Sequence, residues 1–236
     1  RPGPVQVDIT KAAWLTKAVY EKNPKMDLPG YIPIPEICSD SDIKKMNQLL
    51  SVDGCKPVVI AGHGVEIGHA EVELLKFAER HGIPVVNTLL GLGSFPQGHP
   101  LWIGMIGMHG DAVANYAVDE ANLIIGIGTR FSDRIIGRLD SFVKGKTFVH
   151  IDIDPSEINK IVPASLPLCG DVKDVLSRAN NLLNCHDKYP AWWEKIAKWK
   201  EKYGFLDFTV NPQRDPKLLS QARLVKMISD ATDGEA

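Results

Sequence analysis

The sequence alternates short apolar runs with longer segments of helical periodicity, and this alternation limits the possible folds more than any other feature. Apolar runs of strand length occupy 56–61, 83–86, 123–127 and 147–151. Because nearly every position in each run is apolar, the runs fit strands buried on both faces of a parallel sheet. Strands separated by helices cannot pair as hairpins, so the right-handed crossover rule predicts a doubly wound α/β domain.

Amphipathic segments lie between these runs and have the spacing of surface helices. Ser41 or Asp42 is expected to cap the first of them, and Asp171 a later one. A helix over 190–203 carries three tryptophans on one stripe, which is expected to pack against the domain or a neighbour, with cofactor stacking as the alternative. The other helices are expected over 41–50, 70–80, 111–120, 171–183 and 217–233.

Charge and hydropathy narrow the class of partner. The 27 basic and 29 acidic residues leave a formal net charge of -2, and neither sign is gathered into a long run. This balance excludes a nucleic-acid or anionic-membrane surface and favours a small-molecule partner. The longest apolar stretches are far shorter than the roughly 20 residues that span a bilayer, and no signal-peptide pattern is present.

The cysteines and histidines give no metal or redox motif. Cys38, Cys55, Cys169 and Cys185 are scattered, and none belongs to a C-x-x-C pair. The histidines have no ligand spacing such as H-E-x-x-H. We therefore expect no protein-bound metal ion and a reducing compartment.

Glycine-rich loops follow the predicted strands. They lie at 62–64, 88–93 and 126–130, and Asp152 and Asp154 follow the last of the four apolar runs. The carboxyl ends of parallel strands form the edge of the sheet where ligands bind, and glycine lets backbone amides approach a ligand. None of the loops is a complete G-x-G-x-x-G, so each alone fits a structural turn equally well. Together they favour a nucleotide-like ligand.

Arg130 and Arg134 flank the segment 131–133 directly after a buried run. They form either a solvated surface pair or part of a pyrophosphate site. Charge-assisted bonds to a pyrophosphate contribute about 1.5 to 3 kcal/mol each, against about 0 to 1 kcal/mol for an exposed ion pair. Asp152 and Asp154 could accept a ribose hydroxyl or cap a helix before Pro155, and both interpretations stay open.

The motifs, in their order along the chain, resemble the central domain of the acetohydroxyacid synthase (acetolactate synthase) family of thiamine-diphosphate enzymes. The most specific is G-T-R-F-S-D-R at 128–134, which related enzymes without flavin generally lack. The resemblance implies a Rossmann-like, six-stranded parallel sheet holding an extended FAD that has no net redox role. The other matching segments are 1–5, 62–64, 82–85, 88–96, 104–110, 114–117, 150–155 and 169–171.

The resemblance also implies a division into domains. Residues 1–12 would be the last strand of a preceding pyrimidine-binding domain, 13–38 a linker and 39–185 the FAD-binding domain. Residues 186–216 would be a helix and linker, and 217–236 the start of the following diphosphate-binding domain. In the family, those two neighbouring domains hold the glutamate that activates the thiamine ring and the motif that binds diphosphate and Mg²⁺. The chain alone is therefore expected to be inactive.

Carried over position by position, the resemblance assigns three residues to the substrate site. Arg134 would bind the carboxylate of the second 2-oxo acid, which suits its planar fork. Met108 would face the active centre, and Lys11 would line the entrance channel. The positions expected to hold FAD are Arg1, Gly62, His63, Gly64, Thr88, Leu89, Leu90, His109, Gly110, Gly128, Arg130, Asp152, Ile153, Asp171 and Val172.

The chain departs from the family pattern at three positions. Ser132 stands where an aspartate is usual, Thr10 where a proline is usual, and His63 where a glycine is usual. An imidazole at position 63 could donate a hydrogen bond to the flavin or could crowd it, and both outcomes stay open.

The leading hypothesis is a transferase of the acetolactate synthase type. Such an enzyme condenses two pyruvates, or pyruvate and 2-oxobutanoate, with loss of CO₂ in branched-chain amino-acid biosynthesis, and it requires thiamine diphosphate and Mg²⁺. We expect a homo-oligomer, able to carry a regulatory subunit, in the cytoplasm or in the plastid or mitochondrion of a eukaryote. The alternatives are the central domain of a glyoxylate carboligase or oxalyl-CoA decarboxylase type of enzyme, and a stand-alone nucleotide-binding module.

Overall fold

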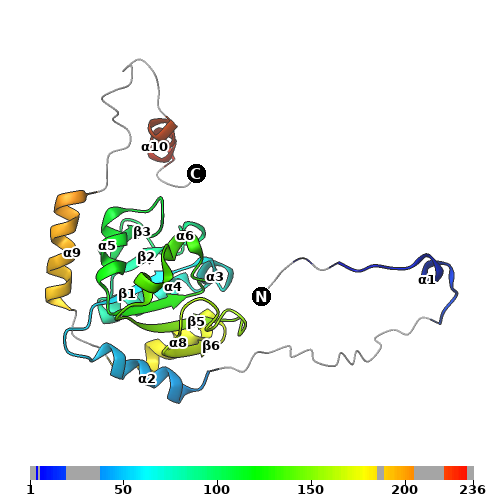
Figure 1. The fold of residues 1–236 in the computed structure, drawn as a ribbon. Helices are drawn as coiled ribbons and strands as arrows, with labels where there is room; N and C mark the ends of the chain where they lie inside the picture. Colours follow the sequence, from blue (N-terminus) through cyan, green and yellow to red (C-terminus); the bar gives the residue numbers. More distant parts are fainter. Residues whose placement is uncertain (1–3, 5, 20–37, 185–188, 205–220, 233–236) are drawn as a thin grey trace.

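The centre of the molecule is a six-stranded sheet in which all strands are parallel (Figure 1). The computed structural model describes residues 4, 6–19, 38–184, 189–204 and 221–232. The predicted doubly wound α/β fold is confirmed. The strands are β1 (Pro57–Ala61), β2 (Val85–Asn87), β3 (Trp102–Met105), β4 (Leu123–Ile127), β5 (Thr147–Asp152) and β6 (Leu166–Cys169).

The strand order reverses at the middle of the sheet. The order β3-β2-β1-β4-β5-β6 means that the chain first builds outward from β1 to one edge. It then returns to place β4 on the other side of β1 and builds outward to the opposite edge. The loops that follow β1 and β4 therefore diverge, and the space between such loops is where doubly wound sheets bind ligands.

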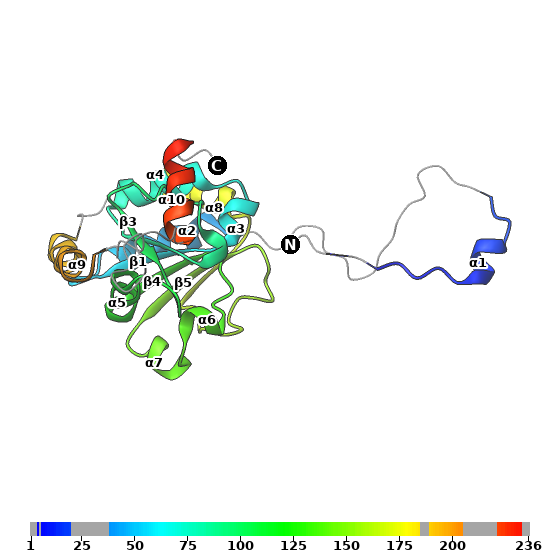
Figure 2. The same ribbon diagram turned by 90° about the horizontal axis from the view of Figure 1, so that it is seen from above.

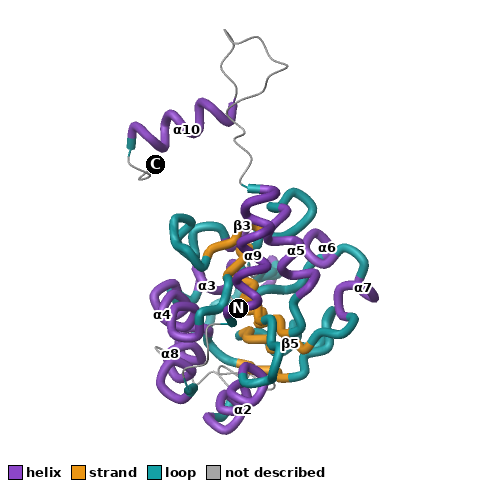
Figure 3. The backbone as a smooth tube through the Cα atoms, turned by 90° about the vertical axis from the view of Figure 1, so that its left-hand side faces the viewer, coloured by secondary structure: helices purple, strands orange, loops and turns teal. Residues whose placement is uncertain are grey.

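Helices cover both faces of the sheet (Figure 3). Along β1, Val59 and Ala61 pack under one layer, while Val58 and Ile60 pack under the other. One layer consists of α2 (Asp40–Leu50), α3 (His63–Ile67), α4 (Glu71–His81) and α8 (Val172–Leu182). The other consists of α5 (Ala112–Glu120), α6 (Asp133–Ile136), α7 (Leu139–Val143) and α9 (Pro190–Tyr203). All residues of β1 and β4 are buried, as the continuous apolar runs predicted.

Two predicted helix caps have different outcomes. The cap of α2 is Ser39, not Ser41 or Asp42. Ser39 Oγ accepts from the Asp42 N–H, and the Asp42 carboxylate accepts from the Ser39 N–H, so Asp42 is the second half of a capping box. Hydrogen bonds from Lys45 and Ser39 lower the pKa of the Asp42 carboxyl to about 2. The prediction that Asp171 caps α8 is confirmed, since its side chain accepts from the Asp174 N–H.

The tryptophans of α9 pack against the domain, which confirms the packing interpretation. Trp192 Nε1 donates to the Pro57 carbonyl at 3.1 Å, and Trp193 Nε1 donates to the Gly82 carbonyl at 2.8 Å. These bonds join α9 to the sheet and to the C-cap of α4. The stripe thus anchors a helix on the core.

The segments outside this domain differ from the prediction at one end. Residues 6–10 form no strand, and α1 (Lys11–Leu15), capped by Thr10, follows them. A strand needs a partner strand to pair with. The described residues of this segment, 4 and 6–19, are all exposed, and they lie away from the sheet in the views of Figures 1 and 2. The helix predicted over 217–233 is confirmed in its described part as α10 (Gln221–Ala231). Of the predicted linker 13–38, residues 20–37 lie outside the described residues.

No helix in the described ranges is both long enough and apolar enough to cross a membrane.

Candidate cofactor-binding site

A cavity of about 780 Å³ opens at the carboxyl edge of the sheet. Its volume is that of pockets that enclose small molecules and cofactors, which measure roughly 300 to 1,000 Å³. The loops after β1 to β5 and the start of α8 after β6 all contribute to its walls. The predicted residues that line it are Gly62, His63, Gly64, Thr88, Leu89, Leu90, Met108, His109, Gly128, Arg130, Arg134, Asp152, Ile153, Asp171 and Val172.

Two of the predicted residues that the structure describes do not line this cavity, and a third cannot be placed. Arg1 lies outside the described residues. Lys11 is the first residue of the exposed helix α1, and the structure does not bring it to the cavity. Gly110 follows the lining residue His109, and its N–H donates to the Gly107 carbonyl at 2.9 Å. A Cβ at Gly110 would lie 2.3 Å from the Met105 carbonyl oxygen, so this glycine shapes the loop from behind the cavity wall.

The sequence reasoning assigned no role to several other lining residues. Ile67 and Gly68 lie three and four positions after Gly64, a spacing that puts them on the same face of α3 and could have identified them. For Ser132, the sequence indicated only a departure from the family pattern. The remaining members are Met105, Ile106, Gly107, Thr129 and Ile135, all neighbours of predicted residues.

Glycines form the floor of the cavity at the point where the strand order reverses. The Gly64 N–H donates to the Gly128 carbonyl at 3.0 Å, and the Gly62 N–H donates to the Ile127 carbonyl at 2.9 Å. A Cβ at Gly64 would lie 2.6 Å from the Gly128 Cα, and one at Gly62 would lie 2.2 Å from the Gly128 carbonyl oxygen. Two backbones are therefore in direct contact here, and only glycine leaves room for this contact.

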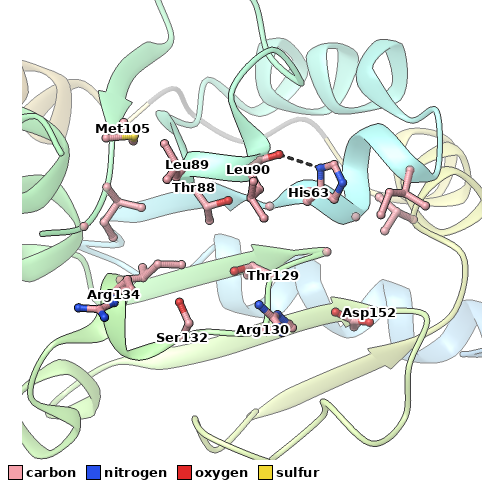
Figure 4. A pocket seen from close by; sticks show the side chains of 18 of the residues that line it. His63, Thr88, Leu89, Leu90, Met105, Thr129, Arg130, Ser132, Arg134 and Asp152 are labelled. Atoms are coloured by element: carbon pink, nitrogen blue, oxygen red, sulfur yellow. Dashed lines mark hydrogen bonds between the residues drawn. The ribbon is translucent and has the colours of Figure 1, made fainter. Parts of the chain in front are cut away.

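A buried phenylalanine shapes the loop that carries the two arginines, residues 128–134, the arginine loop. Phe131 has a φ of 51°, which is rare for a residue with a side chain, and it is 1% exposed. Its ring packs onto Gly126, where a Cβ would lie 2.3 Å from the Phe131 Cζ. With Phe131 turned into the core, Arg130, Ser132 and Arg134 line the cavity (Figure 4).

The cavity has two facing walls of different chemistry (Figure 4). Leu89 and Leu90 are largely exposed on one wall, although they are apolar. On the other wall, neither guanidinium of Arg130 and Arg134 has an ion-pair or hydrogen-bond partner within the described part of the chain. This arrangement suits a ligand with an apolar body and an anionic group. In Figure 4 one wall shows Met105, Leu89, Thr88, Leu90 and His63, and the other shows Arg134, Ser132, Arg130, Thr129 and Asp152.

A second set of contacts fixes the loop that carries Met108. The Asn115 side chain accepts from the Gly107 N–H and donates to the Gly107 carbonyl, each at 3.0 Å. The Met108 N–H donates to the Arg134 carbonyl at 3.0 Å. The structure thus brings Met108 and Arg134 together, as the resemblance implied, and Asn115 is a positioning residue that the sequence reasoning did not identify.

The two aspartates at the carboxyl end of β5, Asp152 and Asp154, have different roles. Asp152 lines the cavity, its Oδ1 accepts from the Asp154 N–H at 2.9 Å, and burial raises the pKa of its carboxyl. Asp154 accepts from the backbone N–H and the hydroxyl of Ser156, at 2.9 and 2.6 Å. No helix begins at Pro155, so the cap interpretation is wrong, and Asp154 stabilises a turn instead.

His150 supports the arginine loop from below. Its Nε2 lies 2.9 Å from the Thr129 carbonyl oxygen, and because a carbonyl only accepts, Nε2 carries the proton. The imidazole is 1% exposed and contacts the Phe131 ring edge-on at 5.0 Å between centroids. Burial lowers the pKa of His150 below its usual value. The neutral ring therefore fixes the peptide that precedes Arg130.

This lowered pKa predicts an acid-labile fold. In the unfolded chain the His150 imidazole takes up a proton below a pH of about 6.5, whereas burial opposes protonation in the folded protein. The free energy of unfolding therefore falls as pH falls through this value. The loss is up to about 1.4 kcal/mol per pH unit between the two pKa values. Urea unfolding of wild type and His150→Gln at several pH values checks this. The difference between the two proteins should shrink toward acid, and parallel curves would contradict the assignment.

A doubly wound parallel sheet with a cavity at its reversal point places the domain in the Rossmann-like class. Comparison with known families is more specific. Residues 43–179 match the model described as "Thiamine pyrophosphate enzyme, central domain". The chain belongs to the thiamine pyrophosphate enzyme family and contains its central domain.

Curated relatives are named as acetolactate synthases. The chain is 43% identical over 231 residues to the probable acetolactate synthase large subunit of Methanocaldococcus jannaschii, covering 94% of this chain and 39% of the relative. It is 37% identical over 236 residues to the acetolactate synthase large subunit of Lactococcus lactis, covering 100% and 40%. It is 34% identical to acetolactate synthase 2, chloroplastic, of Nicotiana tabacum, covering 100% and 35%. The chain thus spans about two fifths of the length of these relatives.

The described residues contain no group of three or more histidine, cysteine, aspartate or glutamate side chains that could hold a metal ion.

Proposed function

We propose that this chain is the central domain of an acetolactate synthase large subunit and that its cavity binds FAD. The names of the relatives support the parent activity, the condensation of pyruvate with a second 2-oxo acid and loss of CO₂. The observation that carries the FAD proposal is the guanidinium of Arg130, which has no partner among the described residues and lines the cavity beside its glycine floor. An anionic dinucleotide is the ligand class that this combination fits.

The residues present fit FAD along the length of the cavity. Arg130 would pair with the diphosphate, and the Asp152 carboxylate would accept a ribose hydroxyl. The glycine floor allows the ligand to lie close to the backbone, and Leu89 would contact an apolar ring. FAD would be a resident cofactor without net redox change in the condensation. Thiamine diphosphate would supply the electron sink for decarboxylation, held with Mg²⁺ by parts of the enzyme outside this chain.

Arg134 and Met108 would serve the substrate. Arg134 is exposed, lies next to Met108 through a backbone hydrogen bond and stands at the opposite end of its wall from Asp152 (Figure 4). In this arrangement Arg134 would bind the carboxylate of the acceptor 2-oxo acid with its planar fork. Lys11 is proposed for the entrance channel, where other parts of the enzyme would complete the wall.

The test of the parent activity is an assay of the full-length protein with pyruvate, thiamine diphosphate, Mg²⁺ and FAD. We expect acetolactate, and more of it with FAD than without. No acetolactate under saturating pyruvate would contradict the proposal. Condensation of glyoxylate, or decarboxylation of oxalyl-CoA, in place of acetolactate would indicate another member of the family.

Arg130→Ala is expected to weaken FAD binding by about 10- to 100-fold, because a charge-assisted hydrogen bond to phosphate contributes about 1.5 to 3 kcal/mol. Quenching of flavin fluorescence by the full-length protein measures the dissociation constant. Arg138→Ala is the matched control, since Arg138 is exposed in the same loop region but does not line the cavity. Equal effects of the two substitutions would show that general charge, and not contact by Arg130, governs binding.

A further inference from the structure

His63 joins two loops at the rim of the cavity. It follows β1, whereas Leu90 belongs to the short helix η1 (Leu89–Gly91) after β2. His63 Nδ1 lies 2.8 Å from the Leu90 carbonyl oxygen (Figure 4). Because the carbonyl only accepts, Nδ1 carries the proton and donates. The sequence left open whether this imidazole would meet the ligand or crowd it, and its Nδ1 is instead directed at the neighbouring loop.

The two ends of η1 are held very differently. The Gly91 carbonyl accepts from Asn87 Nδ2 and Ser94 Oγ, each at 2.7 Å. A Cβ at Gly91 would lie 2.3 Å from the Ala61 carbonyl oxygen, so this end is pressed against β1. Leu89 and Leu90, by contrast, are 68% and 63% exposed.

Among the described residues, the His63 imidazole is the one side chain that hydrogen-bonds the backbone of Leu89 or Leu90. These two leucines form part of the apolar wall of the cavity. Glu66 is the other neighbour of the ring, with its Oε2 at 3.4 Å from Nδ1, beyond the shorter distance to Leu90. Within the described part of the chain, the wall is therefore tied to the loop after β1 by one side-chain hydrogen bond.

We infer that His63 is a positioning residue that fixes the Leu89–Leu90 wall before the ligand arrives. A wall already ordered in the free protein loses less conformational freedom when it binds a ligand, and the affinity rises by that amount. The ligand part of this inference rests on the proposed binding of FAD. The ordering of η1 does not depend on the identity of the ligand.

Asparagine at position 63 separates the hydrogen bond from the imidazole. Its side-chain N–H₂ stands close to the position of Nδ1 and can donate to the Leu90 carbonyl, whereas alanine cannot. His63→Ala, His63→Asn and Glu66→Gln are compared with wild type in the full-length protein. Since both positions lie at an exposed rim, urea unfolding is expected to give nearly the same free energy for all four proteins.

The first readout needs no ligand. Hydrogen exchange of the Gly91 and Leu92 amides, which bond to the Thr88 and Leu89 carbonyls, should be about fivefold faster in His63→Ala than in wild type. His63→Asn and Glu66→Gln should exchange like wild type. Exchange in His63→Ala at the wild-type rate, or in His63→Asn at the faster rate, would overturn the inference. So would an equal effect of Glu66→Gln.

The second readout is the dissociation constant for FAD. We expect His63→Ala to bind about fivefold more weakly, and His63→Asn and Glu66→Gln to bind like wild type. Unchanged affinity in His63→Ala, together with faster exchange, would overturn the ligand part and leave the ordering role. Failure of wild type to bind FAD would overturn the proposed function, while the exchange rates would still decide whether His63 orders η1.

Discussion

Gly128→Ala is expected to lower the free energy of unfolding by roughly 3 kcal/mol and to abolish FAD binding. Two costs add at this position. Gly128 has a φ of 56°, which disfavours any side chain, and a new Cβ would lie 2.6 Å from the Gly64 Cα. The atoms that the new Cβ would meet are all backbone atoms of Gly64, so the two loops must separate, and the floor of the cavity opens with them.

Two other glycines separate these costs. Gly54 and Gly145 have φ of 69° and 70°, and neither has an atom within 4 Å of a new Cβ. Alanine at either position should cost only the backbone strain, about 1 to 2 kcal/mol, and should leave FAD binding intact. Urea unfolding and flavin titration of the three variants make the comparison. Equal losses of stability at the three positions would show that the Gly64–Gly128 contact adds nothing.

Arg134→Ala in the full-length enzyme should reduce kcat/KM for the acceptor 2-oxo acid by roughly 100-fold, since a bidentate pair with a carboxylate is lost. Release of CO₂ from the first pyruvate should change much less. The reason is that Arg134 is exposed at the cavity without an ion-pair partner among the described residues, and its backbone is bonded to Met108.

Separate assays of CO₂ release and acetolactate formation measure these two half-reactions. Arg134→Lys keeps the charge but loses the planar fork, so it should recover only part of the acceptor step. Arg138→Ala again controls for net charge. Equal loss in both half-reactions would contradict the role assigned to Arg134.

The strands at the centre of the sheet were predictable and those at its edges were not. β1 and β4 are buried throughout, and a strand that is buried on both faces has an unbroken apolar run in its sequence. β3 and β6 are edge strands, and their sequences contain Gly104 and Pro167. Proline is tolerated at an edge because one side of the strand needs no ladder bonds, but it removes the local signal for a strand. The number of six strands came from the resemblance alone.

The site shows the same division between local and distant information. Strand ends fix where a ligand binds, so the glycine loops and Arg130 could be assigned from the order of elements. The contacts that hold those loops join residues far apart in the sequence: His150 with Thr129, and His63 with Leu90. No local pattern encodes such a pair. The prediction of the α2 cap was wrong for a simpler reason: several consecutive polar residues could each have been the N-cap.

Titration of the flavin-free full-length protein with FAD tests the central claim most directly. Flavin fluorescence should be quenched along a single saturable curve. The curve should shift to higher FAD concentration in Arg130→Ala and should stay unchanged in Arg138→Ala. A wild-type protein that leaves flavin fluorescence unchanged at saturating FAD, or that binds FAD equally well without Arg130, would contradict the claim that this cavity is a flavin site.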